Sequence, residues 1–105
     1  MSIVTGPDNL PHISYVEESL DLVKYAHFDG SSWNITHVED LGDAYNNGDV
    51  YDTSIVLNSL GLPEIAYAFR NYSGTAWDYG VRYATFNGTY WSIDTVMSRA
   101  TSYTW

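Results

Sequence analysis

The sequence predicts an all-β fold made of two copies of one four-stranded antiparallel unit. Three observations carry this prediction: β-branched and aromatic residues alternate with polar residues at a period of two, turn-forming residues bound each alternating segment, and the whole pattern occurs twice along the 105 residues. The length is therefore interpreted as twice about 52 residues, not as one independent domain.

The internal repeat is carried by two blocks of matching residues. Residues 2–15 recur at 54–67 with a displacement of 52, and residues 25–38 recur at 83–96 with a displacement of 58. The change in displacement indicates a six-residue insertion between the two blocks of the second copy. The most specific matches are the motifs Leu-Pro-x-Ile-x-Tyr and Tyr-Ala-x-Phe-[Asp/Asn]-Gly-x-x-Trp, which each occur once per copy.

Each copy is expected to hold four strands, because four alternating segments are separated by polar links. In the first copy these strands cover residues 2–5, 12–16, 23–28 and 33–38. In the second copy they cover residues 51–57, 64–69, 81–86 and 91–96.

The links between the strands carry turn chemistry. Asp-Gly at 29–30 and Asn-Gly at 87–88 follow the third strand of each copy, and these pairs supply the positive backbone angle of a tight hairpin. Pro11 and Pro63 stand at the start of the second strand, where a missing amide donor is tolerated. An up-and-down order then places the links after the first and third strands at one end of each unit, and the remaining links at the other end.

A four-stranded antiparallel unit of about fifty residues, repeated in tandem, resembles one blade of a β-propeller. The resemblance implies a first blade over residues 1–53 and a second over 54–105. Since two blades cannot close a ring, we expect homo-oligomerisation: three chains give a six-bladed propeller and four give an eight-bladed one. Residues 101–105 are expected to complete the inner strand of a neighbouring chain's first blade, and a homotrimer is the favoured assembly.

The stretches 28–33 and 86–91 resemble the aromatic-Asp-Gly-x-x-Trp segment of small bacterial and fungal fucose-binding propeller lectins. Some members of that family are short two-blade chains that trimerise into six-bladed rings. The family holds its sugar with an Arg on the second strand and a Glu on the third strand. The matching places here are occupied by Ile13, Ile65, Tyr25 and Tyr83. The resemblance therefore implies the architecture and the tryptophans, but not fucose specificity.

The insertion at 70–80 is the best single candidate for a ligand site. It combines aromatic rings, a guanidinium group, a carboxylate and amides, a mixture that stacks on sugar rings and hydrogen-bonds their hydroxyls. Its candidate ligand-binding residues are Arg70, Tyr72, Trp77, Asp78 and Tyr79. The alternative interpretation is that Trp77 and Tyr79 fold inward as a lid over the blade edge.

Two further tryptophans, Trp33 and Trp91, occupy the same place in each copy and are added to the candidate ligand residues. The competing interpretation is that they pack one blade against the next, because repeated aromatics in a propeller serve that purpose often.

Charge and composition exclude several partners. The chain carries 13 acidic and 4 basic side chains, a net charge of −9, so neither nucleic acid nor a membrane surface is expected as a partner. The absence of cysteine excludes disulfides and thiolate zinc sites. No signal peptide and no apolar run of membrane-spanning length is present in the sequence as written, so we expect a soluble protein whose compartment stays open.

No enzyme, cofactor or metal site is predicted. A Gly-x-Ser-x-Gly nucleophile turn is missing, and the acidic stretch 39–49 lacks the spacing of a calcium loop, so it is interpreted as a solvated turn. The histidines at 12, 27 and 37 form no His-x-His or His-x-x-x-His pair. They are expected to be separate histidines on strand surfaces.

Two functions follow from these observations. The first is a multivalent, lectin-like propeller that binds carbohydrate or glycoprotein through repeated weak sites. The alternative is a protein-interaction or structural propeller, natural or an engineered fragment, with no sugar ligand.

Overall fold

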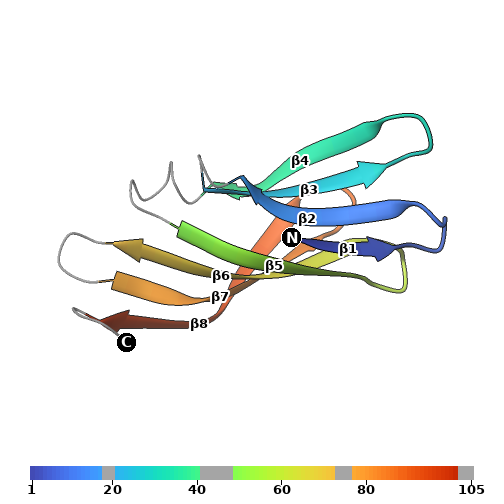
Figure 1. Ribbon diagram of the computed structural model, residues 1–105. Helices are drawn as coiled ribbons and strands as arrows, with labels where there is room; N and C mark the ends of the chain where they lie inside the picture. Colours follow the sequence, from blue (N-terminus) through green and yellow to red (C-terminus); the bar gives the residue numbers. More distant parts are fainter. Residues whose placement is uncertain (18–20, 41–48, 73–76, 102–105) are drawn as a thin grey trace.

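The computed structural model confirms the all-β prediction (Figure 1). It describes residues 1–17, 21–40, 49–72 and 77–101, and the side chains among them except those at 40, 49, 71–72, 77–78 and 98–101. The described residues form two four-stranded antiparallel sheets with the strand orders β1-β2-β3-β4 and β5-β6-β7-β8, here called sheet 1 and sheet 2. Within the described chain, no helix is long and apolar enough to cross a membrane.

The strands of each sheet follow one another along the sequence. Sheet 1 contains β1 (Ser2–Thr5), β2 (Pro11–Glu17), β3 (Leu22–Phe28) and β4 (Trp33–Asp40). Sheet 2 contains β5 (Asp49–Leu57), β6 (Pro63–Tyr72), β7 (Trp77–Phe86) and β8 (Trp91–Thr101). Both prolines expected near the start of a second strand are its first residue, as the loss of one amide donor allows.

The insertion at 70–80 differs from the prediction. We expected a loop there, but β6 continues to Tyr72 and β7 begins at Trp77, with Arg70 opposite Tyr79 and Tyr72 opposite Trp77 in the ladder. The second arm of the insertion, Trp77-Asp78-Tyr79-Gly80, alternates aromatic with polar or small residues, a period-two pattern typical of a strand. The first arm, residues 69–72, does not alternate by itself and is extended by pairing residue for residue with the second. Only residues 73–76 of the insertion lie outside the described strands.

The tight turns after β3 and β7 are confirmed. Gly30 and Gly88 both have a φ of +99°, a conformation that favours glycine. The residue before each glycine caps its turn: Asp29 accepts hydrogen bonds from the amides of Ser31 and Ser32, and Asn87 accepts them from the two equivalent amides. Because strand order is sequential, these turns share one end of each sheet with the β1–β2 and β5–β6 links.

The two sheets pack face to face, and the core lies between them. Strand β5 of sheet 2 contacts β1, β2 and β3 of sheet 1, as Figure 1 shows by the place of β5 beside β1 and β2. The buried residues of this core come from both sheets: Val23, Tyr25 and Val38 from sheet 1, and Val50, Ile55, Ile65, Tyr67, Phe69 and Ala84 from sheet 2.

A partly buried polar network ties the sheets together around Glu39. Tyr67 donates its hydroxyl to Glu39 Oε1 at 2.6 Å, and Arg82 Nη1 donates to Glu39 Oε2 at 2.6 Å. The Arg82 guanidinium also lies 4.2 Å from the ring centre of Phe69. Glu39 begins the stretch that we expected to be a solvated acidic turn, and for this residue the expectation is wrong because sheet 2 supplies it with two donors.

Repeat-equivalent residues differ in burial between the sheets. Ile55 is 4% exposed while Ile3, at the same repeat position, is 65% exposed. The reverse holds on the opposite faces, where Val38 of sheet 1 is 7% exposed and Val96 of sheet 2 is 65% exposed. Each sheet therefore has one covered and one open face. Large exposed apolar residues mark the open face of sheet 1 (Ile3, Trp33, Ile35) and the open face of sheet 2 (Tyr51, Val56, Val96, Met97).

Three register shifts interrupt the ladders of the described strands. One β-bulge falls between Val23 and Lys24 and a second between Val81 and Arg82, the same repeat position, and a third shift falls between Val50 and Thr53 of β5. Strand β1 pairs with β2 only as far as Ser14, so residues 15–17 of β2 pair with β3 alone among the described strands. The predicted filling of such a gap by a neighbour's C-terminal segment concerns residues 101–105. Of these, Thr101 is the last residue of β8 and pairs with Trp77 of its own sheet, while residues 102–105 lie outside the described chain.

Candidate functional site

The predicted ligand residues fall into two groups at opposite ends of the sheets. The insertion residues lie where β6 meets β7, whereas Trp33 and Trp91 lie beside the turns that follow β3 and β7. Tyr79 and Phe86, the partner of Trp91, are seven positions apart on β7, which corresponds to about 23 Å at 3.3 Å per residue. The structure therefore does not bring Trp91 to the insertion.

The insertion end of sheet 2 brings a guanidinium group next to aromatic rings. Arg70 stands opposite Tyr79 in the β6–β7 ladder, and its guanidinium carbon lies 5.7 Å from the ring centre of Tyr51 on β5. Three more candidates, Tyr72, Trp77 and Asp78, belong to the same ladder through their backbones, and their side chains lie outside the described part of the chain.

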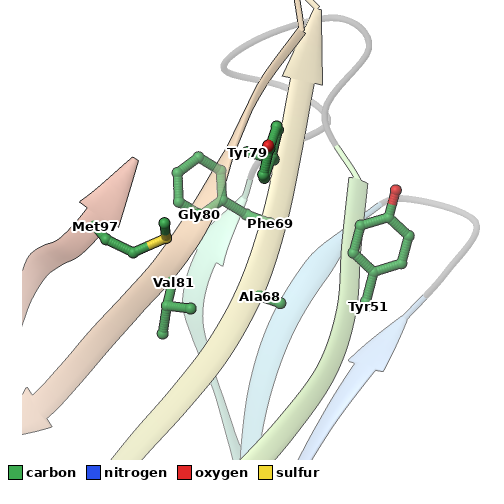
Figure 2. Close-up of a pocket in the computed structure, with 7 residues that line it drawn as sticks. All are labelled: Tyr51, Ala68, Phe69, Tyr79, Gly80, Val81 and Met97. Carbon is green, nitrogen blue, oxygen red and sulfur yellow. The ribbon is translucent and has the colours of Figure 1, made fainter. Parts of the chain in front are cut away.

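A hollow of about 210 Å³ lies beside this end, on the open face of sheet 2 (Figure 2). Its lining residues are Tyr51, Ala68, Phe69, Tyr79, Gly80, Val81 and Met97. The small side chain of Ala68 leaves the depression between larger neighbours. Since ligand pockets measure roughly 300–1,000 Å³, this hollow has the size for one ring, such as an aromatic side chain or the apolar face of a sugar.

The two equivalent tryptophans have different surroundings. Trp91 is partly buried and packs edge-on against Tyr25 of sheet 1, with ring centres 5.7 Å apart, so it bridges the two sheets. Trp33 packs against Phe28 of its own sheet at 5.3 Å and belongs to the open face of sheet 1. In this chain, one tryptophan is a packing residue and the other is accessible.

Sequence reasoning missed a third group, formed by Asp8, His12 and His27. The β2–β3 register places His12 directly opposite His27, and their rings stack at 4.1 Å. Asp8 Oδ1 lies 3.8 Å from His12 Nε2, and Asp8 Oδ2 lies 3.5 Å from His27 Nε2. His12 is buried, so the expectation of a strand-surface histidine is wrong for this residue. The signal that could have found the pair is the antiparallel register of 12–16 with 23–28.

The surroundings lower the pKa of both His12 and Asp8. Burial lowers the pKa of His12, and the neighbouring His27 lowers it further. The Asp8 carboxylate favours a proton on the His12 ring and so acts in the opposite direction, but the net shift is downward. The backbone amide of Leu10, which donates to Asp8 Oδ1 at 3.0 Å, holds the pKa of that carboxyl below its usual value. At neutral pH the group therefore offers an uncharged imidazole beside a carboxylate.

No protein-family model matches the chain, and no curated protein or solved structure matches it either. No residue role is therefore inherited from a relative. The repeat and the packing of its two sheets are the strongest indications of architecture.

Proposed function

We propose that this chain is a subunit of a ring-shaped β-propeller, assembled from copies of itself, that binds carbohydrate at the Arg70–Tyr79 end of each subunit. The observation that carries the proposal is the exchange of burial between repeat-equivalent residues. Ile3 is open where Ile55 is covered, and Val96 is open where Val38 is covered. The open face of sheet 2 thus presents the repeat positions that sheet 1 covers, and the open face of sheet 1 presents those that sheet 2 covers.

This pattern supports a head-to-tail contact between copies. The open face of sheet 2 in one chain would pack on the open face of sheet 1 in the next, just as the covered faces pack within one chain. A contact between two different faces produces a closed ring when the rotation per subunit fits, with six blades from three chains or eight from four.

The hollow on the open face of sheet 2 supports the same contact. Three of its residues, Ala68, Val81 and Met97, are repeat-equivalent to Val16, Val23 and Glu39. Within the chain, Glu39 accepts a hydrogen bond from the Tyr67 hydroxyl, Val23 belongs to the same core cluster as the Tyr67 ring, and Val16 packs against that cluster. Tyr15 is the repeat equivalent of Tyr67, so the Tyr15 ring of a second copy is the group that we expect in the hollow.

Carbohydrate binding rests on the end of the hollow next to Arg70, which Tyr51 and Tyr79 line. Arg70 and Tyr79 lie side by side in the ladder, and Arg70 also contacts the Tyr51 ring. A guanidinium group with aromatic rings can hydrogen-bond sugar hydroxyls and stack on sugar C–H faces. A ring would repeat this site once per chain, and several weak sites then give strong binding to a multivalent glycan surface.

The assembly is tested by light scattering coupled to size-exclusion chromatography. We expect about 35 kDa, three times the 11.8 kDa of one chain, and single chains for either Ile3→Asp or Val96→Asp. Each variant keeps one intact face, so a mixture of the two should form a two-chain species. Leu60→Asp, an exposed apolar residue in the β5–β6 link, is the matched control and should leave the mass unchanged. A wild-type protein that runs as a single chain contradicts the assembly.

Carbohydrate binding is tested on a glycan array with the assembled protein. Arg70→Ala and Tyr79→Ala should each abolish binding, whereas Tyr90→Ala, an exposed tyrosine in the turn after β7, should leave it intact. Trp77→Ala extends the test to the tip of the hairpin. If the assembled protein binds no glycan, the sugar part of the proposal is wrong while the assembly stands.

A structural or protein-interaction propeller is the second candidate function. It is favoured by two placements: the hollow lies on the face that would stack on the next copy, and Trp91 packs between sheets. Both placements use aromatic residues for packing. An assembled ring that binds no glycan would leave this function as the better account.

A further inference from the structure

We propose that Asp8, His12 and His27 form a binding site for a divalent transition-metal ion, with zinc as the best fit. The β2–β3 register brings the two imidazoles together, and the β1–β2 link adds the carboxylate. Imidazole nitrogen and carboxylate oxygen are the ligands that Zn²⁺ takes in the absence of thiolates, and three protein ligands leave a fourth position for water. This inference does not depend on self-assembly or on carbohydrate binding.

The distances suit an ion that draws its ligands together. One ligand atom from each residue, a ring nitrogen or a carboxylate oxygen, lies within 4.8 Å of the other two. Zinc bonds of roughly 2.0–2.2 Å place tetrahedral ligand atoms about 3.3 Å apart, so binding requires an approach of up to about 1.5 Å. Asp8 is exposed and His27 is partly buried, so both side chains have room to rotate toward the fixed ring of His12.

Two buried ring nitrogens in this group lack a hydrogen-bond partner among the described residues. They are His12 Nε2, in a side chain that is only 5% exposed, and His27 Nε2. Their distances to the Asp8 oxygens, 3.8 Å and 3.5 Å, exceed the range of a normal hydrogen bond. Buried polar atoms without partners are rare because they forgo the bonds that water would give them. An ion between these nitrogens and Asp8 would satisfy both.

Neighbouring groups orient two of the three ligands, His12 and Asp8, as an outer shell does in metal sites. His12 Nδ1 shares a hydrogen bond of 2.6 Å with the hydroxyl of Tyr25; when that hydroxyl accepts, Nε2 presents its lone pair toward Asp8. The Leu10 amide orients the carboxylate. Gly6 leaves room beside the ligand atoms, since a Cβ at this position would lie 2.9 Å from His12 Nε2 and 3.0 Å from Asp8 Oδ1.

Sheet 2 shows what the same positions look like without the ligand set. The equivalents of His12 and His27 are Glu64 and Thr85, and the equivalent of Asp8 is Leu60. The tyrosine is kept: Tyr83, equivalent to Tyr25, donates its hydroxyl to Glu64. The tyrosine bond therefore belongs to both units, whereas the two imidazoles and the carboxylate meet only in the first.

The site is tested by titrating the full chain with Zn²⁺ alone in a calorimeter. His27→Gln and Asp8→Asn each remove a ligand, and we expect a larger loss of affinity than the roughly 10- to 100-fold that removal of an outer-shell partner costs. Tyr25→Phe removes such a partner and should fall within that 10- to 100-fold range. The matched control is His37→Gln, an exposed histidine on β4, which should leave the affinity within about twofold.

A second measurement on the wild-type chain keeps the proposal testable if a variant fails to fold. Zinc should shift the ring nitrogen resonances of His12 and His27 in NMR spectra and leave those of His37 unchanged. Co²⁺ should give the intense visible absorption of a tetrahedral ion. Unchanged ring resonances of His12 and His27, or equal losses of zinc affinity in His37→Gln and His27→Gln, would overturn the proposal.

Discussion

Sheet 1 and sheet 2 share one repeat pattern, but they bury opposite faces of it. Ile55 is covered by sheet 1, whereas Ile3 at the same repeat position is open. Trp91 bridges the sheets while Trp33 lies on an open face. Burial in this protein is thus set by the order in which the sheets stack, and much less by the identity of the side chain. At these repeat positions, an apolar residue that is exposed in one sheet has an equivalent that is buried in the contact between the two sheets.

The polar residues show how the two units differ. Arg82 of sheet 2 pairs across to Glu39, whereas its equivalent Lys24 pairs within sheet 1 to Glu17 at 3.1 Å. The position of Glu39 itself is taken by Met97 in sheet 2. The contact inside the chain is therefore partly ionic, whereas the open face of sheet 2 is apolar at the position of Glu39 and the open face of sheet 1 keeps a cation, Lys24, at the position of Arg82. Four predictions test this comparison, from the largest effect to the smallest.

The largest effect is expected from truncating the covered member of an isoleucine pair. Ile55→Ala should lower the free energy of unfolding by about 2–5 kcal/mol, because it leaves a cavity in the core between the sheets. Ile3→Ala in dissociated chains should cost less than about 1 kcal/mol, since its side chain is already exposed. Urea denaturation monitored by tryptophan fluorescence measures both. Equal costs would mean that the sheets do not stack as described.

The next effect concerns the ionic contact between the sheets. Glu39→Gln should lower the free energy of unfolding by about 1–3 kcal/mol, because a neutral amide replaces the carboxylate that Tyr67 and Arg82 bond. Glu17→Gln breaks only the more exposed pair with Lys24 and should cost less than about 1 kcal/mol. Urea denaturation at low and high salt compares the two, and a larger cost for the Glu17 variant would contradict the assignment.

A smaller, pH-dependent effect is expected from Tyr67. Burial raises the pKa of the Tyr67 hydroxyl well above its usual value of 10, and the hydrogen bond to Glu39 raises it further. The folded state therefore holds this proton more tightly than the unfolded state, so the stabilisation is complete below pH 10 and is lost as the pH rises above it. Unfolding free energies at about pH 9 and pH 11 measure the slope. Tyr67→Phe should reduce this dependence of the unfolding free energy on pH. An unchanged dependence would show that Tyr67 is not its cause.

The smallest effect is expected in the turns after β3 and β7. Hydrogen bonds from the amides of Ser32 and Ser31 lower the pKa of Asp29 to about 2. The stabilisation from this cap is present above the ordinary carboxyl pKa of 3.8 and is lost as the pH falls through about 2. The equivalent Asn87 cannot titrate. In an NMR titration from neutral to acid pH, the Ser31 amide should shift near pH 2, whereas the Thr89 amide should show no such step.

The sequence alone predicted the elements that depend on local pattern. The alternation of apolar and polar residues located all eight strands, and Asp29-Gly30 with Asn87-Gly88 located two tight turns. The β6–β7 hairpin is longer than predicted, because only its second arm, residues 77–80, carries the strand alternation, while the first arm is extended by the pairing between the two. Local pattern is enough for strands because the side chains of one strand alternate between the two faces of its sheet.

What the sequence could not predict depends on contacts between distant residues. The repeat gives Ile3 and Ile55 the same neighbours in sequence, so only the packing of the sheets decides which is buried. The meeting of Asp8, His12 and His27 needs both the β2–β3 register and the path of the β1–β2 link. Of the predicted ligand residues, Arg70 and Tyr79 do lie together, while Trp91 belongs to the core contact.

The paired β-bulges have a consequence for how such proteins can change in size. Both bulges fall at the same repeat position, next to Val23 and next to Val81. A bulge increases the local right-handed twist, so the β3–β4 and β7–β8 pairs gain the same extra twist at the same place. Strand pairs with the same local twist can stack on one another repeatedly in the same relative orientation. Duplication of the coding segment would therefore lengthen the stack within a single polypeptide, without any new surface having to arise by mutation.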